Sequence, residues 1–69
     1  MDSRIKEWIV RRKLKNDLVA ERLGVSRETV SKWCNNKAVP SLKKAFELAN
    51  LLNCKVDDLY YFETNELDP

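Results

Sequence analysis

The sequence has no histidine, one glycine, two prolines and two cysteines that are not in a CxxC spacing. A zinc site needs about four nitrogen or sulfur ligands, so we expect no metal and no other cofactor. The thiols of Cys34 and Cys54 are expected to be reduced and partly buried, with a single disulfide as the alternative. Without histidine, a glycine-rich phosphate loop or paired buried carboxylates, no catalytic group can be assembled, and the chain is not expected to be an enzyme.

Long apolar runs are also missing. Charged residues interrupt every apolar stretch from Asp2 to Asp68, and none approaches the ~20 residues of a membrane span. No signal-peptide pattern is found, so we expect a cytoplasmic protein without membrane contact. The 69 residues suffice for one domain near the lower size limit for independent folding. An effector domain does not fit beside it, and no small-molecule effector is expected.

Charge is unevenly distributed along the chain. Residues 1–44 hold twelve Lys or Arg and five Asp or Glu, a net charge of +7. Residues 45–69 hold one basic and six acidic residues, a net charge of −5. This asymmetry favours an N-terminal part that faces a polyanion, although an ordinary solvated surface would show the same pattern.

Apolar residues recur at helical spacing and predict a single all-α bundle. Gly24 and Asn53 are expected to end helices, and Ser26 to cap one. For residues 61–69 two alternatives stay open, namely fraying or a short C-terminal extended arm or hairpin. On the fourth helix the predicted core face holds Leu42, Ala45, Phe46, Ala49 and Leu52. The predicted helices span residues 3–13, 16–23, 27–34, 41–52 and 56–60.

The third predicted helix has two contrasting faces on a helical wheel. Val30 and Trp33 form an apolar stripe, and we place both Trp33 and Trp8 in the core rather than at a stacking surface. The opposite face carries side chains of the types that read base edges or phosphates. These are Arg27, Glu28, Ser31, Lys32 and Asn35.

The stretch NDLVAERLGVSRETVSKWCN, residues 16–35, has the spacing of a helix-turn-helix. Two helices that cross steeply need a small residue at their contact, and Ala20 supplies it. They also need a tight turn, which Gly24 permits, and apolar anchors after that turn, which Val25 and Val30 provide. All of these residues stand at the required positions.

Four stretches of the chain carry a resemblance to a known family, and they are IKEW, LVAERLGVSRETVSKW, NNKAVPSL and LANLLNCKVDDL. The chain resembles the Cro/cI-type (XRE) family of phage and bacterial repressors over residues 4–60, and these stretches fall where the helices and joining loops of that family lie. The resemblance implies a five-helix lambda-repressor-like domain, usually dimeric, that binds double-stranded DNA with residues 27–34 in the major groove. Ile9 and Cys34 stand where the family commonly pairs arginine with glutamate, so an apolar contact is expected there. Asn36 stands at a turn position where many members of the family have glycine.

The DNA contacts expected on this basis fall into two groups. Arg27 is expected to bind guanine O6 and N7, with a phosphate contact as the alternative. For Glu28 a pair with Lys32 is favoured over a contact with cytosine. The complete base-reading set is Arg27, Glu28, Ser31 and Lys32. The phosphate-binding set is Lys15, Asn16, Thr29, Asn35 and Lys37, with Lys43 or Lys44 as further candidates.

The C-terminal third carries more large apolar groups than one short helix can bury. We expect a homodimer interface there, with capping of the monomer's own core as the alternative. The function expected is a sequence-specific DNA-binding transcriptional regulator, most simply a dimeric repressor on an inverted-repeat operator. An antitoxin-like or other partner-binding module that also autoregulates its promoter is less favoured, since only seven residues follow Phe62. The interface residues are Leu59, Tyr60, Tyr61 and Phe62.

Overall fold

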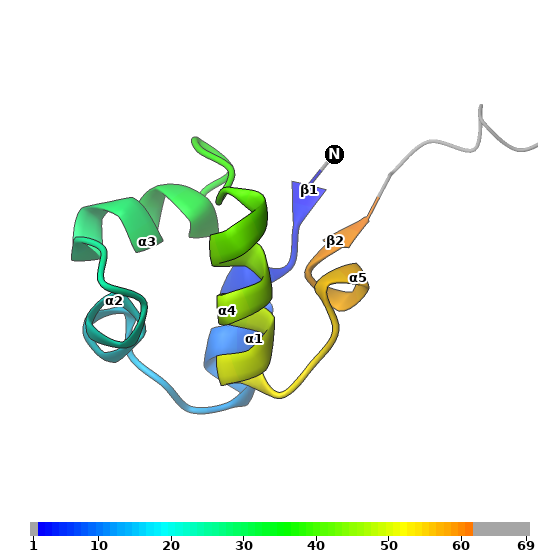
Figure 1. Ribbon diagram of the computed structural model, residues 1–69, viewed down its shortest axis with the longest axis horizontal. Coiled ribbons are helices and arrows are strands. Elements are labelled where there is room, and N and C mark those ends of the chain that lie inside the picture. Colours follow the sequence, from blue (N-terminus) through cyan, green and yellow to red (C-terminus); the bar gives the residue numbers. More distant parts are fainter. Residues whose placement is uncertain (1, 62–69) are drawn as a thin grey trace, which may run out of the picture.

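The computed structural model describes residues 2–61, which form five helices and one short strand pair (Figure 1). The predicted all-α five-helix class is confirmed. The strands are β1 (Asp2–Ser3) and β2 (Tyr60–Tyr61). Phe62 and the rest of the predicted arm lie outside the described residues. The helices are α1 (Ile5–Arg11), α2 (Asn16–Leu23), α3 (Arg27–Cys34), α4 (Leu42–Leu52) and α5 (Val56–Leu59).

The strand pair joins the two ends of the described chain. The strands β1 and β2 are antiparallel, with Ser3 opposite Tyr60. Ser3 also donates its amide to Oδ1 of Asn36 at 3.0 Å and its hydroxyl to the Trp33 carbonyl at 3.2 Å. Because Ser3 is extended and Lys13 is left-handed (φ 59°), the predicted first helix was too long at both ends.

The predicted helix ends are confirmed by backbone geometry. Gly24 and Asn53 are left-handed, with φ of 70° and 56°, and each follows the last residue of its helix. The hydroxyl of Ser26 accepts a hydrogen bond from the Thr29 amide at 3.1 Å and so caps α3. Asn36 takes its turn at φ 60°, a conformation that asparagine tolerates better than most residues.

The core lies where all five helices meet. The prediction for α4 was wrong at Leu42 and Phe46, whose side chains are 73% and 60% exposed. At about 100° per residue, a narrower arc of α4 that includes Leu48 faces the core instead. The main buried side chains are Ile5, Ile9, Val19, Leu23, Val30, Trp33, Leu48, Leu52 and Leu59.

The helices are short. The longest, α4, has 11 residues, whereas a membrane span needs about 20. Within residues 2–61 no helix is therefore long and apolar enough to cross a membrane.

Candidate nucleic-acid interface

The turn between α2 and α3 is held by hydrogen bonds to the end of α2. The Gly24 amide donates to the Glu21 carbonyl at 3.3 Å, and the Val25 amide donates to the Ala20 carbonyl at 3.0 Å. From α4, Nζ of Lys44 donates to the carbonyl of Leu23. These bonds fix the start of α3 relative to both neighbouring helices.

The two faces of α3 are those that the helical wheel predicts. Val30 has no exposed surface and Trp33 is 4% exposed, so both anchor the helix in the core. Arg27 and Lys32 are exposed and Ser31 is half-buried. The polar side chains of α3 therefore lie on its outer side, supported by a rigid apolar stripe.

Arg27 has a partner that the sequence does not reveal. Its Nη1 lies 3.2 Å from Oδ1 of Asp17, in the first turn of α2, and the two side chains are 72% and 67% exposed. An ion pair this exposed contributes about 0–1 kcal/mol. The guanidinium can leave Asp17 for a stronger bidentate partner at small cost.

Glu28 and Lys32 do not form the predicted helical pair within the described part of the chain. Both side chains are exposed, and a pair four residues apart contributes only about 0.2–0.5 kcal/mol, too little to order two solvated side chains. The hydroxyl of Thr29 is hydrogen-bonded to that of Ser26 at 2.9 Å. Thr29 therefore takes part in the cap of α3.

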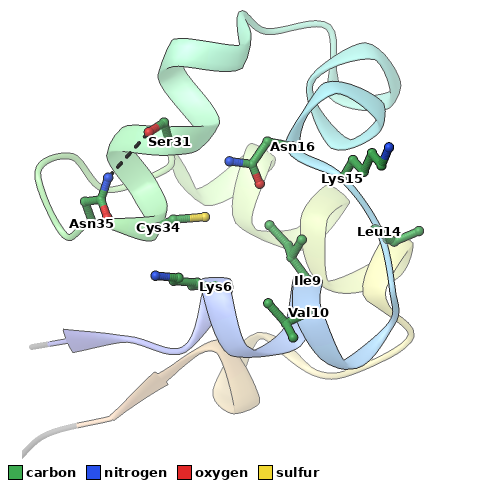
Figure 2. Close-up of a pocket in the computed structure, with 9 residues that line it drawn as sticks. All are labelled: Lys6, Ile9, Val10, Leu14, Lys15, Asn16, Ser31, Cys34 and Asn35. Carbon is green, nitrogen blue, oxygen red and sulfur yellow. Dashed lines mark hydrogen bonds between the residues drawn. The ribbon is translucent and has the colours of Figure 1, made fainter.

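Several predicted phosphate-binding residues are brought together by the fold. Lys15 precedes α2 and its side chain makes no capping hydrogen bond. The first amides of α2 have no acceptor within the helix, and they lie at the positive end of the helix dipole. At the far end of α3, Nδ2 of Asn35 donates to Oγ of Ser31 at 3.4 Å. These two helix ends face one another, and one pocket is lined by Lys15, Asn16, Ser31 and Asn35 (Figure 2).

Lys37 lies beyond this group, exposed in the turn after α3. Lys44, a further candidate for the phosphate group, makes contacts within the fold. Besides its bond to Leu23, its ammonium lies 3.0 Å from Oε1 of Glu47, and the side chain is mostly buried. Lys44 therefore serves the fold.

Arg12 is a second structural cation that sequence reasoning did not assign. Its Nε donates to the Leu52 carbonyl at 2.7 Å and its Nη2 to the Asn53 carbonyl at 3.2 Å. These carbonyls belong to the last residue of α4 and to its C-cap, and they have no partners within the helix. Arg12 thus ties α1 to the C-terminus of α4.

The tryptophans are used for packing. Trp33 is buried, as predicted. Trp8 is half-buried and donates from Nε1 to the Asp58 carbonyl at 3.0 Å. The guanidinium carbons of Arg11 and Arg12 lie 4.7 and 5.1 Å from the Trp8 ring centre. Neither indole presents a free face of the kind that stacks on bases.

The predicted dimer residues divide between two environments. Leu59 is fully buried inside the monomer, so its side chain contributes to the protomer's own core. Tyr60 is half-buried against that core, and burial raises the pKa of its hydroxyl. The side chain of Tyr61 and all of Phe62 lie outside the described part of the chain. Large apolar side chains that do remain exposed are Val10, Val39, Leu42 and Phe46.

Both thiols are free, as predicted. Burial raises the pKa of the Cys34 thiol, and the nearby Lys6 ammonium opposes that rise. Burial also raises the pKa of Cys54. Ile9 and Cys34 line the same pocket. The space where an apolar contact was expected is therefore only partly filled.

Comparison with known proteins places this geometry in context. The profile of the helix-turn-helix family matches residues 5–59. An uncharacterised HTH-type transcriptional regulator of Archaeoglobus fulgidus is 37% identical over 67 residues, which cover 97% of this chain and 94% of the relative. The crystal structure of a candidate DNA-binding protein from Bacteroides fragilis is similar at a TM-score of 0.81 and 38% identity, covering 84% of this chain and 94% of that chain. A transcriptional regulator from Listeria innocua gives a TM-score of 0.71 at 25% identity, covering 99% and 68%.

Proposed function

Because the chain belongs to the helix-turn-helix family of Cro/cI (XRE) type, we propose that it is a transcriptional regulator that reads double-stranded DNA through α3. The family consists of regulators and not of enzymes. In the finer proposal, a homodimer binds an inverted-repeat operator and represses by excluding polymerase in the cytoplasm. The observation that carries the proposal is the outward polar face of α3, held in place by the buried Val30 and Trp33.

Base reading is proposed for four side chains of α3. Arg27, in the first turn, exchanges Asp17 for O6 and N7 of a guanine, a bidentate contact worth about 1–3 kcal/mol of discrimination. Ser31 and Lys32 lie one turn further along the same face. Glu28 accepts a hydrogen bond from a cytosine amino group. Where α3 is misplaced along the DNA, the Glu28 carboxylate repels the phosphates instead.

Phosphate binding is proposed for the residues that flank α3. Lys15, Asn16 and the free amides of the first turn of α2 form a positive helix end, which suits a phosphate. Asn35 and Lys37 reach the backbone from the other end of α3, and Thr29 from its beginning. Such contacts set the position of α3 without reading the sequence.

The homodimer is proposed at the end of the domain around Tyr60, Tyr61 and Phe62, with Leu59 supporting the interface from the core. On α4, a monomer also leaves Leu42 and Phe46 largely exposed, four residues apart, and exposed apolar side chains favour association. A two-fold dimer would present two copies of α3 about 34 Å apart, one turn of DNA.

The test is selection from random duplex DNA at about 150 mM salt, where non-specific binding is weakened, together with sedimentation of the protein alone and bound. We expect an enriched inverted repeat that is bound by two chains. Recovery of unrelated sequences, with an affinity that depends on the salt concentration and not on the DNA sequence, would overturn the operator proposal. The partner-binding alternative would then take its place.

A further inference from the structure

A pocket of about 480 Å³ opens between α1, the start of α2 and the end of α3 (Figure 2). This volume falls in the range of small-molecule sites, roughly 300–1,000 Å³. In Figure 2, Cys34 and Asn16 point toward one another across the pocket. Its apolar lining comes mainly from α1 and the residues after it, namely Ile9, Val10 and Leu14.

The polar lining has one sign of charge. Lys6 and Lys15 are the charged residues of the lining, and among the described residues that line the pocket none is acidic. The Cys34 thiol adds no negative charge at neutral pH, because burial raises its pKa. The remaining groups are hydrogen-bonding amides and a hydroxyl, from Asn16, Asn35 and Ser31.

We propose that this pocket binds a small amphipathic organic anion, a carboxylate with a compact apolar body, and that the bound anion competes with DNA. The apolar body would cover Val10, which is 64% exposed, and the partly exposed Leu14, and the carboxylate would face Lys6 and the amide of Asn16. An apolar surface with a few convergent polar groups is the usual make-up of such sites. Binding of the ligand would provide a means of release from the operator.

Competition follows from shared residues, and this part rests on the proposed function. Lys15, Asn16, Ser31 and Asn35 line the pocket and are also the proposed DNA contacts. An anion held there occupies these groups and repels an approaching phosphate. For exclusive binding, the apparent Kd for DNA rises by the factor 1 + [L]/Kd of the ligand, about tenfold at ten times that Kd.

Binding of the anion is tested without DNA, with octanoate as the probe. In the Cys54→Ser variant the only remaining thiol is that of Cys34, and its rate of alkylation by a neutral reagent is measured. Octanoate below its micelle concentration is expected to slow alkylation about tenfold at ten times its Kd. Octanol, which lacks the charge, and acetate, which lacks the apolar body, are expected to protect much less. No protection, or equal protection by octanol, would overturn the proposal.

Two controls separate the pocket from general effects. In Cys34→Ser, alkylation of Cys54 should not respond to octanoate, and an equal response would overturn a specific site. Lys6→Gln should weaken the binding of octanoate about fivefold, which is the loss of affinity expected when an exposed ion pair is removed. The matched variant Lys55→Gln removes a charge that is also exposed but lies outside the pocket, and it should bind octanoate as the parent does. Equal affinities in the two lysine variants would contradict the assigned lining.

A final arm separates this inference from the proposed function. Octanoate is added to the complex of the protein with its selected operator. Competition is supported if the protein is released from DNA over the same octanoate concentrations that protect Cys34 from alkylation. Protection of Cys34 without release of the DNA overturns competition. If selection recovers no operator while Cys34 is still protected, the proposed function fails and the anion site stands.

Discussion

Arg12 offers the sharpest test of how the described contacts hold the domain together. Its guanidinium donates to the carbonyls of Leu52 at 2.7 Å and Asn53 at 3.2 Å, at the C-terminus of α4. A hydrogen bond from a charged group contributes about 1.5–3 kcal/mol when well shielded and about 1 kcal/mol when exposed. One of these bonds is partly buried and the other is exposed. Arg12→Ala should therefore lower the free energy of unfolding by about 2–3 kcal/mol.

Arg11 is the matched control for this change. Its guanidinium lies over the same Trp8 ring, at 4.7 Å against 5.1 Å for Arg12, but it makes no hydrogen bond to α4 in the described part of the chain. Arg11→Ala should lower the free energy of unfolding by less than about 1 kcal/mol. Both variants are unfolded in urea and by heat, followed by far-UV circular dichroism. The Tm of Arg12→Ala is expected to fall by about 8–24 °C, since 1 kcal/mol shifts Tm by about 4–8 °C in a domain of this size. Losses that agree within about 0.5 kcal/mol would refute the role of the two carbonyl bonds.

Three further changes test other parts of the structure. Gly24→Ala should lower the free energy of unfolding in urea by about 1–2 kcal/mol through its left-handed φ of 70° alone, because an added Cβ meets no atom within 4 Å; an unchanged value would contradict this. Asp17→Asn frees Arg27 and removes a negative charge near DNA, so fluorescence anisotropy should show a few-fold tighter operator binding, with stability changed by less than about 1 kcal/mol; weaker binding would count against the proposed interface. Since burial raises the pKa of Cys34, its alkylation rate should reach half-maximum above pH 9.0, and a midpoint below that pH would mean that the thiol is not shielded.

Local features of the fold were predictable because each depends on a few neighbouring residues. Gly24 and Asn53 end their helices by adopting positive φ, which few other residues do cheaply. Ser26 caps α3 through an amide three residues away. Val30 and Trp33 are the large apolar groups of α3, so only one face of that helix can be buried.

Features that depend on distant contacts were not predictable. On α4, residues 42–52 include enough apolar side chains for two overlapping faces, and only packing decides that Leu48 rather than Phe46 is buried. Arg12 reaches carbonyls 40 and 41 residues away, and Lys44 one that is 21 residues away. Nothing near either residue in the sequence marks these bonds. The strands β1 and β2 have two residues each, too few for an alternating pattern.

The candidate site shows the same division. The exposed face of α3 follows from its periodicity, whereas the Asp17–Arg27 pair does not, since it joins exposed charges on two helices. The pocket at the meeting point of α1, α2 and α3 also depends on tertiary packing. Its lining residues come from three separate stretches of the chain, 6–10, 14–16 and 31–35.

The most direct test of the central claim, that α3 reads bases through Arg27, is competition binding of wild type and Arg27→Ala to the selected operator and to each of its single-base variants. Arg11→Ala, which removes an exposed cation away from α3, is measured alongside. Arg27→Ala is expected to lose discrimination by about 5- to 150-fold at one base pair and its symmetry mate, and to keep it at the other positions. A loss of affinity that is uniform across all sequences would contradict base reading and assign Arg27 to the phosphate backbone.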